Sequence, residues 1–198
     1  LTRDCIVPPH TTLRIDAGVT VVIDGFHRIR VHGVILATGT AMHPVVFRAP
    51  LPPESSPARG ASQWDGIAIA GTDAHGHFSH CRISGAYKNI VWESSPVFDS
   101  CTFTDNHYAL YCTKNAMPHI HSSLFADNVF GVVADLANPL MLNNTITGNT
   151  IGVHLQLNSH VAAGKNTIEG NDVNVRSMKA LGENEGAFKV YYLWNLMQ

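Results

Sequence analysis

The sequence repeats a short phrase at intervals of 20 to 22 residues. Each copy ends in isoleucine or phenylalanine, and the last four copies run on into a polar or small pair that ends in asparagine. A fixed period of this length, with strand patterning and no helical patterning, indicates a stacked β-solenoid. The copies are Cys81–Ile83, Cys101–Phe103, Ser123–Phe125, Asn144–Ile146 and Asn166–Ile168.

A second apolar column keeps step with the repeated phrase. Its members are separated by 23, 20, 22, 21 and 22 residues. Residues i and i+2 of a strand share a face, so we expect this column and the residues two positions later to point inward. The residues between them should then point outward. The inward column is Ile67, Ile90, Leu110, Val132, Val153 and Val175, and the outward positions are Ala68, Val91, Tyr111, Val133, His154 and Arg176.

A unit of about 22 residues with two or three short strands is one rung of a parallel β-helix, stacked about 4.8 Å from the next. The sequence therefore predicts an all-β, single-domain parallel β-helix of about seven to eight rungs over residues 1–180. A proline-rich loop insertion at 50–63 interrupts it, and a tail follows at 181–198. Two rungs before residue 50 are predicted from the pairs Ile6 and Ile29, Leu13 and Leu36, and Val21 and Val45.

Composition narrows the classes of partner. Only 14% of the residues are charged and the formal net charge is −2, so no basic surplus favours a nucleic-acid partner. The sequence contains no run of 18 apolar residues, so it predicts no membrane-spanning helix. A chain that starts at Leu1 without methionine is typical of a processed mature form. We therefore expect an extracellular, cell-surface or periplasmic location.

The cysteines and two asparagines fit structural roles. Cys81 and Cys101 hold equivalent positions on adjacent rungs and Cys112 lies in an inward column, so we expect buried thiols that act as small apolar side chains. No Cys-x-x-Cys pair or Cys/His spacing indicates zinc or haem. Asn144 and Asn166 continue the Cys81 column, where stacked amides would form a hydrogen-bonded ladder.

Two further segments, Thr12–Val19 and Trp64–Ile67, together with the repeated phrase, resemble right-handed parallel β-helix proteins of the pectin-lyase-like superfamily. The resemblance reaches to about residue 180 and implies a right-handed coil. It implies no single activity, because the superfamily holds polysaccharide lyases, hydrolases, epimerases and adhesins.

The catalytic motifs of the enzyme branches are missing. The hydrolase pattern that the resemblance implies needs paired aspartates, Gly-His-Gly and Arg-x-Lys, whereas here Gly76-His77-Phe78 departs from the histidine motif and the other two are absent. Lyases of the superfamily need an acidic calcium cluster. Asp105 and Asp127 stack one rung apart and could bind calcium, or they could cap their own turns. This pattern favours a non-catalytic protein.

Histidine is abundant, at 12 of 198 residues. His77 and His119 fall in one predicted column, and Asp99 falls beneath His121. Three interpretations stay open: a solvated polar face, a transition-metal site for copper or zinc, or an acid/base pair. The catalytic alternative uses Asp99, His119 and His121, and the metal alternative adds His77.

Two apolar surfaces are candidates for contact. The outward strip with Val91, Tyr111 and Val133 is apolar where strands usually carry polar residues. The tail could cover an open end of the solenoid or pair with another molecule. Its aromatic residues are Tyr191, Tyr192 and Trp194.

Taken together, these features predict a non-catalytic secreted or surface β-helix that self-assembles or binds a glycan or a surface protein, with no cofactor. The alternatives are a carbohydrate-active enzyme of lyase or hydrolase type and a periplasmic metal-binding β-helix. Calcium or a transition metal would be the cofactor in those alternatives.

Overall fold

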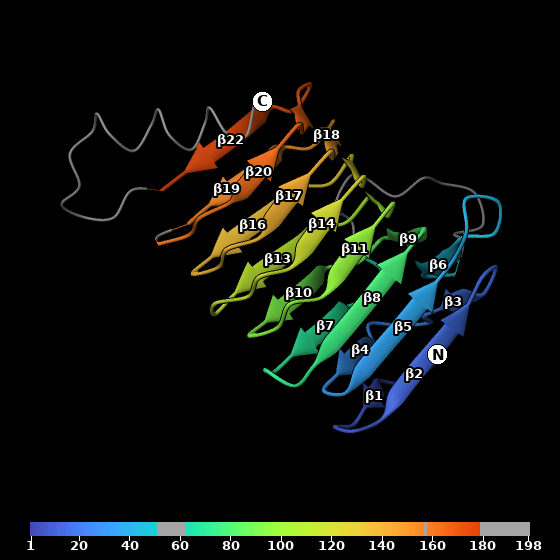
Figure 1. Cartoon of the computed structure of the whole chain (residues 1–198). Helices are drawn as coiled ribbons and strands as arrows, with labels where there is room; N and C mark the ends of the chain where they lie inside the picture. Colours follow the sequence, from blue (N-terminus) through green and yellow to red (C-terminus); the bar gives the residue numbers. More distant parts are fainter. Residues whose placement is uncertain (51–61, 157, 179–198) are drawn as a thin grey trace.

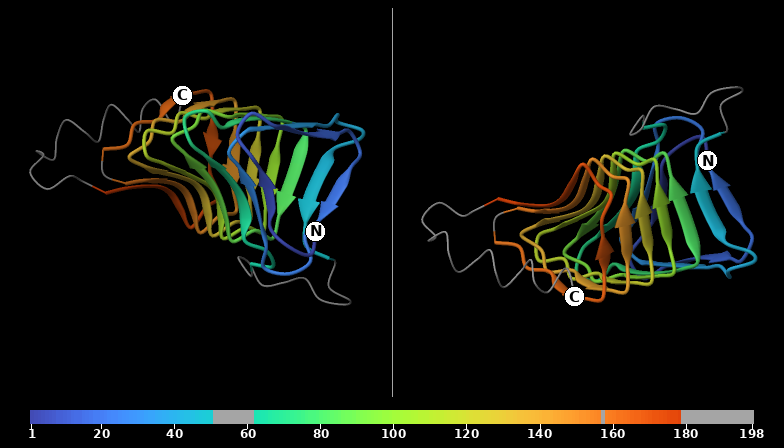
Figure 2. Two further views of the ribbon diagram at one scale, coloured as in Figure 1. Left: turned by 90° about the horizontal axis from the view of Figure 1, so that it is seen from below. Right: turned by 90° about the horizontal axis from the view of Figure 1, so that it is seen from above.

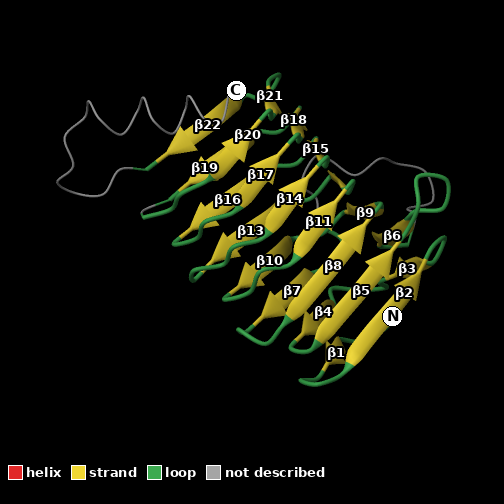
Figure 3. Cartoon of the chain, viewed as in Figure 1, coloured by secondary structure: helices red, strands yellow, loops and turns green. Residues whose placement is uncertain are grey.

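The chain winds into a right-handed parallel β-solenoid, as the repeat predicts (Figures 1 and 3). The computed structural model describes residues 1–50, 62–156 and 158–178. Within these ranges all regular elements are strands, and they form seven rungs of three strands followed by one last strand. None of the described segments forms a helix with the length and apolar character that a helical membrane crossing requires. Most of the loop insertion and the whole predicted tail lie outside the described residues.

Each rung contributes its first strand to sheet A, an eight-stranded parallel sheet. Figure 2 shows these strands stacked side by side along the solenoid. Like positions of successive rungs therefore form columns along the sheet. The strands of sheet A are β1 (Cys5–Val7), β4 (Arg28–Val31), β7 (Gly66–Ala70), β10 (Lys88–Trp92), β13 (Tyr108–Thr113), β16 (Phe130–Asp135), β19 (Ile151–Leu155) and β22 (Val173–Ser177).

The second and third strands of each rung form sheets B and C, each with seven parallel strands. Sheet B holds β2 (Thr12–Asp16), β5 (Val34–Thr38), β8 (His75–Ser79), β11 (Val97–Asp99), β14 (His119–His121), β17 (Leu140–Leu142) and β20 (Ala162–Gly164). Sheet C holds β3 (Thr20–Val22), β6 (Val45–Arg48), β9 (Cys81–Ser84), β12 (Thr102–Thr104), β15 (Leu124–Ala126), β18 (Thr145–Thr147) and β21 (Thr167–Ile168).

The register of β10 differs from the predicted register by one residue. Ile90 pairs with Ala68 and Val91 pairs with Ile69, so Val91 is a core residue and its predicted outward position is wrong. Asn89 takes the inward position instead, and its side-chain oxygen accepts a hydrogen bond from the Ile67 N–H at 3.1 Å. A bulge in β13 restores the predicted alignment in the later rungs.

The first two rungs are also shifted against the predicted pairs. Cys5 pairs with Ile29, so Ile6 points outward beside Arg30 and is 59% exposed. Likewise Leu13 pairs with Ile35. The spacing of apolar residues in the sequence does not predict this register, because the corners of the first and second rungs differ in length.

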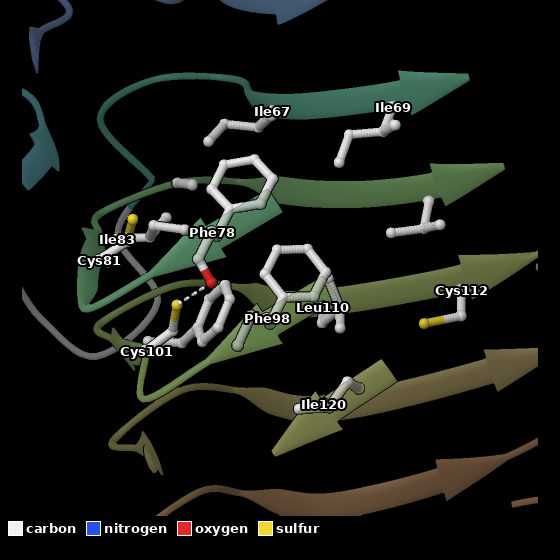
Figure 4. Packing of buried hydrophobic residues seen from close by; sticks show 14 of the residues in the cluster. Ile67, Ile69, Phe78, Cys81, Ile83, Phe98, Cys101, Leu110, Cys112 and Ile120 are labelled. Atoms are coloured by element: carbon white, nitrogen blue, oxygen red, sulfur yellow. Dashed lines mark hydrogen bonds between the residues drawn. The ribbon is translucent and has the colours of Figure 1, made fainter. Parts of the chain in front are cut away.

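Phenylalanine rings form the centre of the core. The rings of Phe103 and Phe125 stack at 4.8 Å on adjacent rungs, and Phe78 stacks on Phe98 at 4.9 Å. Figure 4 shows Phe78 and Phe98 between the isoleucines of sheet A and those of the facing strands. This stacking confirms the predicted apolar column.

The cysteines are apolar core residues, as predicted. All four are free, and Cys81, Cys101 and Cys112 are buried. The Cys101 thiol donates to the Phe78 carbonyl at 3.5 Å (Figure 4). Burial raises the pKa of the Cys112 thiol, so this thiol stays protonated and unreactive.

From the third rung to the seventh, each rung turns two of its corners with one left-handed residue. Between sheets B and C these residues are His80, Ser100, Ser122, Asn143 and Lys165, with φ between 48° and 55°. Between sheets C and A they are Gly85, Asp105, Asp127, Gly148 and Gly170, with φ between 57° and 71°. Glycine, aspartate and asparagine tolerate this conformation well, which explains the residue pairs at the end of the repeated phrase.

Hydrogen-bonded ladders of side chains run from rung to rung along both corners. At the B–C corner, Asn144 accepts from the Ser123 N–H and donates to Asn166, which confirms the predicted ladder. At the C–A corner a second ladder was not predicted, although its residues end the repeated phrase. Its amides hydrogen-bond from rung to rung at 2.8 to 3.0 Å, and its members are Asn106, Asn128, Asn149 and Asn171.

Candidate functional site

The outer face of sheet A carries a continuous row of ring side chains, here called the aromatic row. Tyr108 stacks on Phe130 with ring centroids 4.7 Å apart, and Phe130 stacks on His154 at 5.8 Å. At the other end Tyr87 contacts Tyr108 at 6.0 Å and Phe26 at 6.3 Å. Parallel register places Tyr87, Tyr108, Phe130 and His154 on successive rungs, so these rings line up along the solenoid, and Phe26 extends the row from the rung of β4. The aromatic row is Phe26, Tyr87, His107, Tyr108, Phe130 and His154.

Lys88 lies in the middle of this row. Its Nζ is 4.5 Å from the ring centroid of Tyr111, 4.8 Å from that of Tyr108 and 5.8 Å from that of Tyr87. A cation over ring faces is attracted by the ring quadrupole. The contacts therefore fix one positive charge on an otherwise apolar row.

A concavity of about 230 Å³ lies on the same sheet. Its polar part comes from Arg28, Arg30 and His32, and its apolar part from Ile90, Trp92 and two alanines. Trp92 is 40% exposed, and Lys114 lies 4.9 Å from the centroid of its ring. The concavity thus combines an exposed ring with guanidinium groups.

Carboxylates hold the arginines of the concavity in place. Arg28 pairs with Asp65 at 2.5 Å, and Arg30 pairs with Asp4 at 3.2 Å. The Nε of Arg28 is buried and has no hydrogen-bond partner among the described residues. The guanidinium groups are therefore oriented by the protein, and each ion pair uses only one Nη, so the other Nη remains as a donor for a ligand.

Burial shifts the pKa values of the groups on this face. Burial, and then the charge of Arg28, lower the pKa of Lys88. Burial raises the pKa of Tyr111, and so does the hydrogen bond of 2.6 Å that its hydroxyl donates to Asp135. Tyr108 shifts in the same direction, mainly through burial. Both tyrosines therefore stay neutral at physiological pH and can donate hydrogen bonds.

His107 makes the stability of this face sensitive to acid. Burial, and then the charge of Lys88, lower the pKa of His107, so the unfolded chain binds this proton more readily than the folded protein does. Stability is therefore complete above the ordinary histidine pKa of about 6.5 and falls as the pH drops below it. We expect the melting temperature to fall between about pH 7.5 and about pH 5, and to fall less in His107→Gln.

The exposed His75 of sheet B provides the matched control. His75→Gln should keep the acid-induced decrease of the native protein, as measured by thermal unfolding across the same pH range. An equal decrease in both variants would show that His107 does not contribute.

Two of the three residues predicted for the outward strip are buried in the structure. Val91 is 1% exposed and packs in the core, because the register of β10 is shifted. Val133 keeps its outward register between Tyr111 and His154 but is fully buried, since its short side chain lies between two larger rings. Tyr111 is the one member of that predicted set that lies half-buried on the outer face. The tail residues Tyr191, Tyr192 and Trp194 lie outside the described residues.

The histidines of sheet B lie where the repeat predicts them. Val97 pairs with both His77 and His119, which are therefore two rungs apart. Asp99 pairs with His121, and the distance between Oδ1 and Nδ1 is 3.7 Å. In the described part of the chain, no three His, Cys, Asp or Glu side chains gather as a metal site would need. The structure brings together an Asp99–His121 pair only.

The aspartates proposed for calcium occupy left-handed corners. Asp105 and Asp127 have φ of 58° and 57° and belong to the C–A corner, one rung apart. Glycine takes the same position at 148 and 170. Their place in this column matches the turn role that was the alternative to calcium.

Sequence reasoning missed most of the aromatic row. The strands β10, β13 and β16 start with Lys88, Tyr108 and Phe130, two positions before the predicted inward column, and Tyr87 directly precedes Lys88. This position was outside the columns that the apolar spacing defined. A search for rings at a period of 20 to 22 residues would have found Tyr87, Tyr108 and Phe130.

The comparison with protein families agrees with the β-solenoid architecture. A family described as right handed beta helix region matches residues 62–188, which is more than half of the chain. A comparison with curated proteins gave no match. The strand order, the rung-to-rung register and this match agree that the chain belongs to the right-handed β-helix family.

Proposed function

We propose that this protein is a glycan-binding β-helix that holds an anionic polysaccharide against the outer face of sheet A. The observation that carries the proposal is the aromatic row with Lys88 fixed in its middle. Ring faces pack against the apolar faces of sugars. The ammonium group of Lys88 attracts a carboxylate or sulfate on the same chain.

The length of the row favours an extended ligand. Tyr87, Tyr108, Phe130 and His154 belong to four successive rungs, so the row is roughly 14 Å long at the spacing of neighbouring strands. A single small molecule would contact only part of it. An oligosaccharide that runs along the solenoid axis would contact all four rungs.

The concavity beside the row supplies a place for one charged sugar unit. Its volume of about 230 Å³ is below the roughly 300 to 1,000 Å³ of pockets for drug-sized ligands. Trp92 offers a ring face, and Arg28 and Arg30 offer forked donors that match a carboxylate. Size and chemistry together support a uronate or sulfated sugar at this position.

Replacing Tyr108 by alanine should weaken binding of an anionic oligosaccharide about tenfold, because one stacking surface is lost. Replacing Lys88 by glutamine should weaken anionic ligands by a similar factor and leave a neutral ligand of the same length unchanged. Calorimetric titration with size-matched uronate, sulfated and neutral oligosaccharides measures both effects.

Leu142 is the control, since it is 37% exposed on sheet B and lies away from the row. Leu142→Ala should bind as the native protein does. If no oligosaccharide binds at millimolar concentration, or if Tyr108→Ala binds unchanged, the proposal is wrong.

An enzyme acting on carbohydrates is the second candidate, and the Asp99–His121 pair supports it. A carboxylate beside an imidazole can serve as an acid/base pair, yet this pair lies on sheet B and not beside the aromatic row. The same oligosaccharides can be assayed for unsaturated products and new reducing ends. Product that disappears in Asp99→Asn would favour an enzyme over a binding module.

A further inference from the structure

A polar concavity lies at the corner between sheets B and C, and sheet A contributes no residue to it. In the second rung this corner is a long turn, from Gly39 to Pro44, between β5 and β6. In the third and fourth rungs the corner bends at a single left-handed residue, His80 or Ser100. The long turn therefore borders the compact corners that follow, and about 140 Å³ of space opens there.

The lining of this space consists mainly of hydrogen-bond donors. Arg82 and Thr102 are neighbours in register at the start of sheet C, and His80 and Ser100 precede them at the corner. Thr40 comes from the long turn, where its Oγ1 accepts the His43 N–H at 3.0 Å and keeps its own proton. Arg82, His80 and three hydroxyl residues thus line one small volume that is open to solvent.

The charge of Arg82 is not neutralised within the described structure. Its neighbours in register are Val46 on β6 and Thr102 on β12, and none of the described carboxylates forms an ion pair with it. The closest acidic residue in sequence to the corner is Asp99. That carboxylate accepts the Ser100 hydroxyl at 3.3 Å and lies 3.7 Å from His121 on sheet B. The concavity therefore has an unpaired positive charge and neutral donors.

The volume sets the size of the ligand. About 140 Å³ is several times the roughly 30 Å³ share of one water molecule. It is also well below the roughly 300 Å³ at which pockets for drug-sized ligands begin. The space is large enough for a compact polar group.

We infer that this corner is a binding site for a tetrahedral oxyanion, a phosphate or sulfate group, held by the guanidinium of Arg82 with His80, Thr102 and Thr40 around it. Guanidinium donors match the oxygens of such a group, and charge-assisted hydrogen bonds are the strong ones. The group is a free ion or the ester group of a larger molecule whose remainder stays in solvent. The site is independent of the ligand proposed for sheet A.

The test is a titration of the isotope-labelled protein with inorganic phosphate and with sulfate, followed by NMR. We expect saturable shifts of the amide signals of His80, Arg82 and Thr102. Arg82→Gln should reduce the affinity about tenfold or more. Titrations with a sugar phosphate and a sugar sulfate separate the two sources: tighter binding of the ester identifies an ester group, and equal or weaker binding identifies the free ion.

Lys165→Gln is the matched control. Lys165 is exposed at the same corner of the seventh rung, so the variant removes one positive charge at a distance from the concavity. It should bind both anions as the native protein does. The inference is overturned if neither the free ions nor the esters shift these signals, or if Lys165→Gln weakens binding as much as Arg82→Gln. Circular dichroism of Arg82→Gln checks that the variant is folded.

Discussion

Replacing Asn128 by alanine should lower the free energy of unfolding by about 4 kcal/mol. Asn128 is fully buried in the second asparagine ladder. Its side-chain oxygen accepts from the backbone N–H of Asn106 at 2.9 Å and from the amide group of Asn106 at 3.0 Å. Its own amide donates to the carbonyls of Phe103 and Ala126.

The large effect comes from the groups that remain after the substitution. Alanine would leave two donors of Asn106 buried without an acceptor, and each unsatisfied group costs about 1 to 3 kcal/mol. The carbonyl groups that lose a donor add to this cost. Urea unfolding, followed by circular dichroism, measures the difference.

Asn138 is the control for this prediction. It is half-buried, and its side-chain oxygen accepts one hydrogen bond, of 3.2 Å, from the His160 N–H. Asn138→Ala should therefore cost only about 1 kcal/mol. Equal losses for the two variants would mean that the ladder adds nothing beyond an ordinary surface hydrogen bond.

Gly131→Ala should destabilise the protein by about 3 kcal/mol, although it adds a single methyl group. A Cβ atom at position 131 would lie 2.4 Å from the carbonyl oxygen of Gly152 on the next rung. That oxygen belongs to the backbone of a parallel ladder and cannot move without separating β16 from β19. The strands that carry Phe130 and His154 would shift with it.

Gly164→Ala is the matched control, because the nearest atom to its added Cβ is a side-chain carbon of Leu142 at 3.4 Å. This contact is an ordinary one, so the variant should unfold within about 1 kcal/mol of the native protein. Thermal and urea unfolding of both variants provide the comparison. A Gly131→Ala variant as stable as Gly164→Ala would contradict the close packing of these two strands.

The sequence was sufficient for the fold because a β-solenoid repeats the same local solution in every rung. Phe103, Phe125 and Ile146 occupy one column, and their fixed spacing alone predicts that they stack. The ladder through Asn144 and Asn166 followed from the same spacing. Residues with one role at one period leave little choice of architecture.

The register of β10 could not be predicted from spacing. Ile90 and Val91 are both apolar and β-branched, so hydrophobicity does not distinguish the inward residue from the outward one. The deciding residue is Asn89, which enters the core because its amide replaces a backbone partner for Ile67 and also donates to Ala109. A pattern that counts only apolar side chains does not predict that a polar residue such as Asn89, with its hydrogen bonds made inside the protein, points into the core.

The candidate site was harder to predict than the fold, for a related reason. The concavity of Arg28, Arg30 and Trp92 combines residues of the second, third and fourth rungs, and residues of the loop insertion separate Arg30 from Trp92 in sequence. Its residues follow no common period. The Asp99–His121 pair was predicted because both residues fall at the same place in successive rungs.

The most direct test of glycan binding on sheet A is hydrogen–deuterium exchange of the protein with and without a saturating anionic oligosaccharide. We predict slower exchange in β7, β10, β13, β16 and β19, with no change in sheets B and C away from the corners. Protection on sheet B around Asp99 and His121, or no protection anywhere despite binding, would contradict the account.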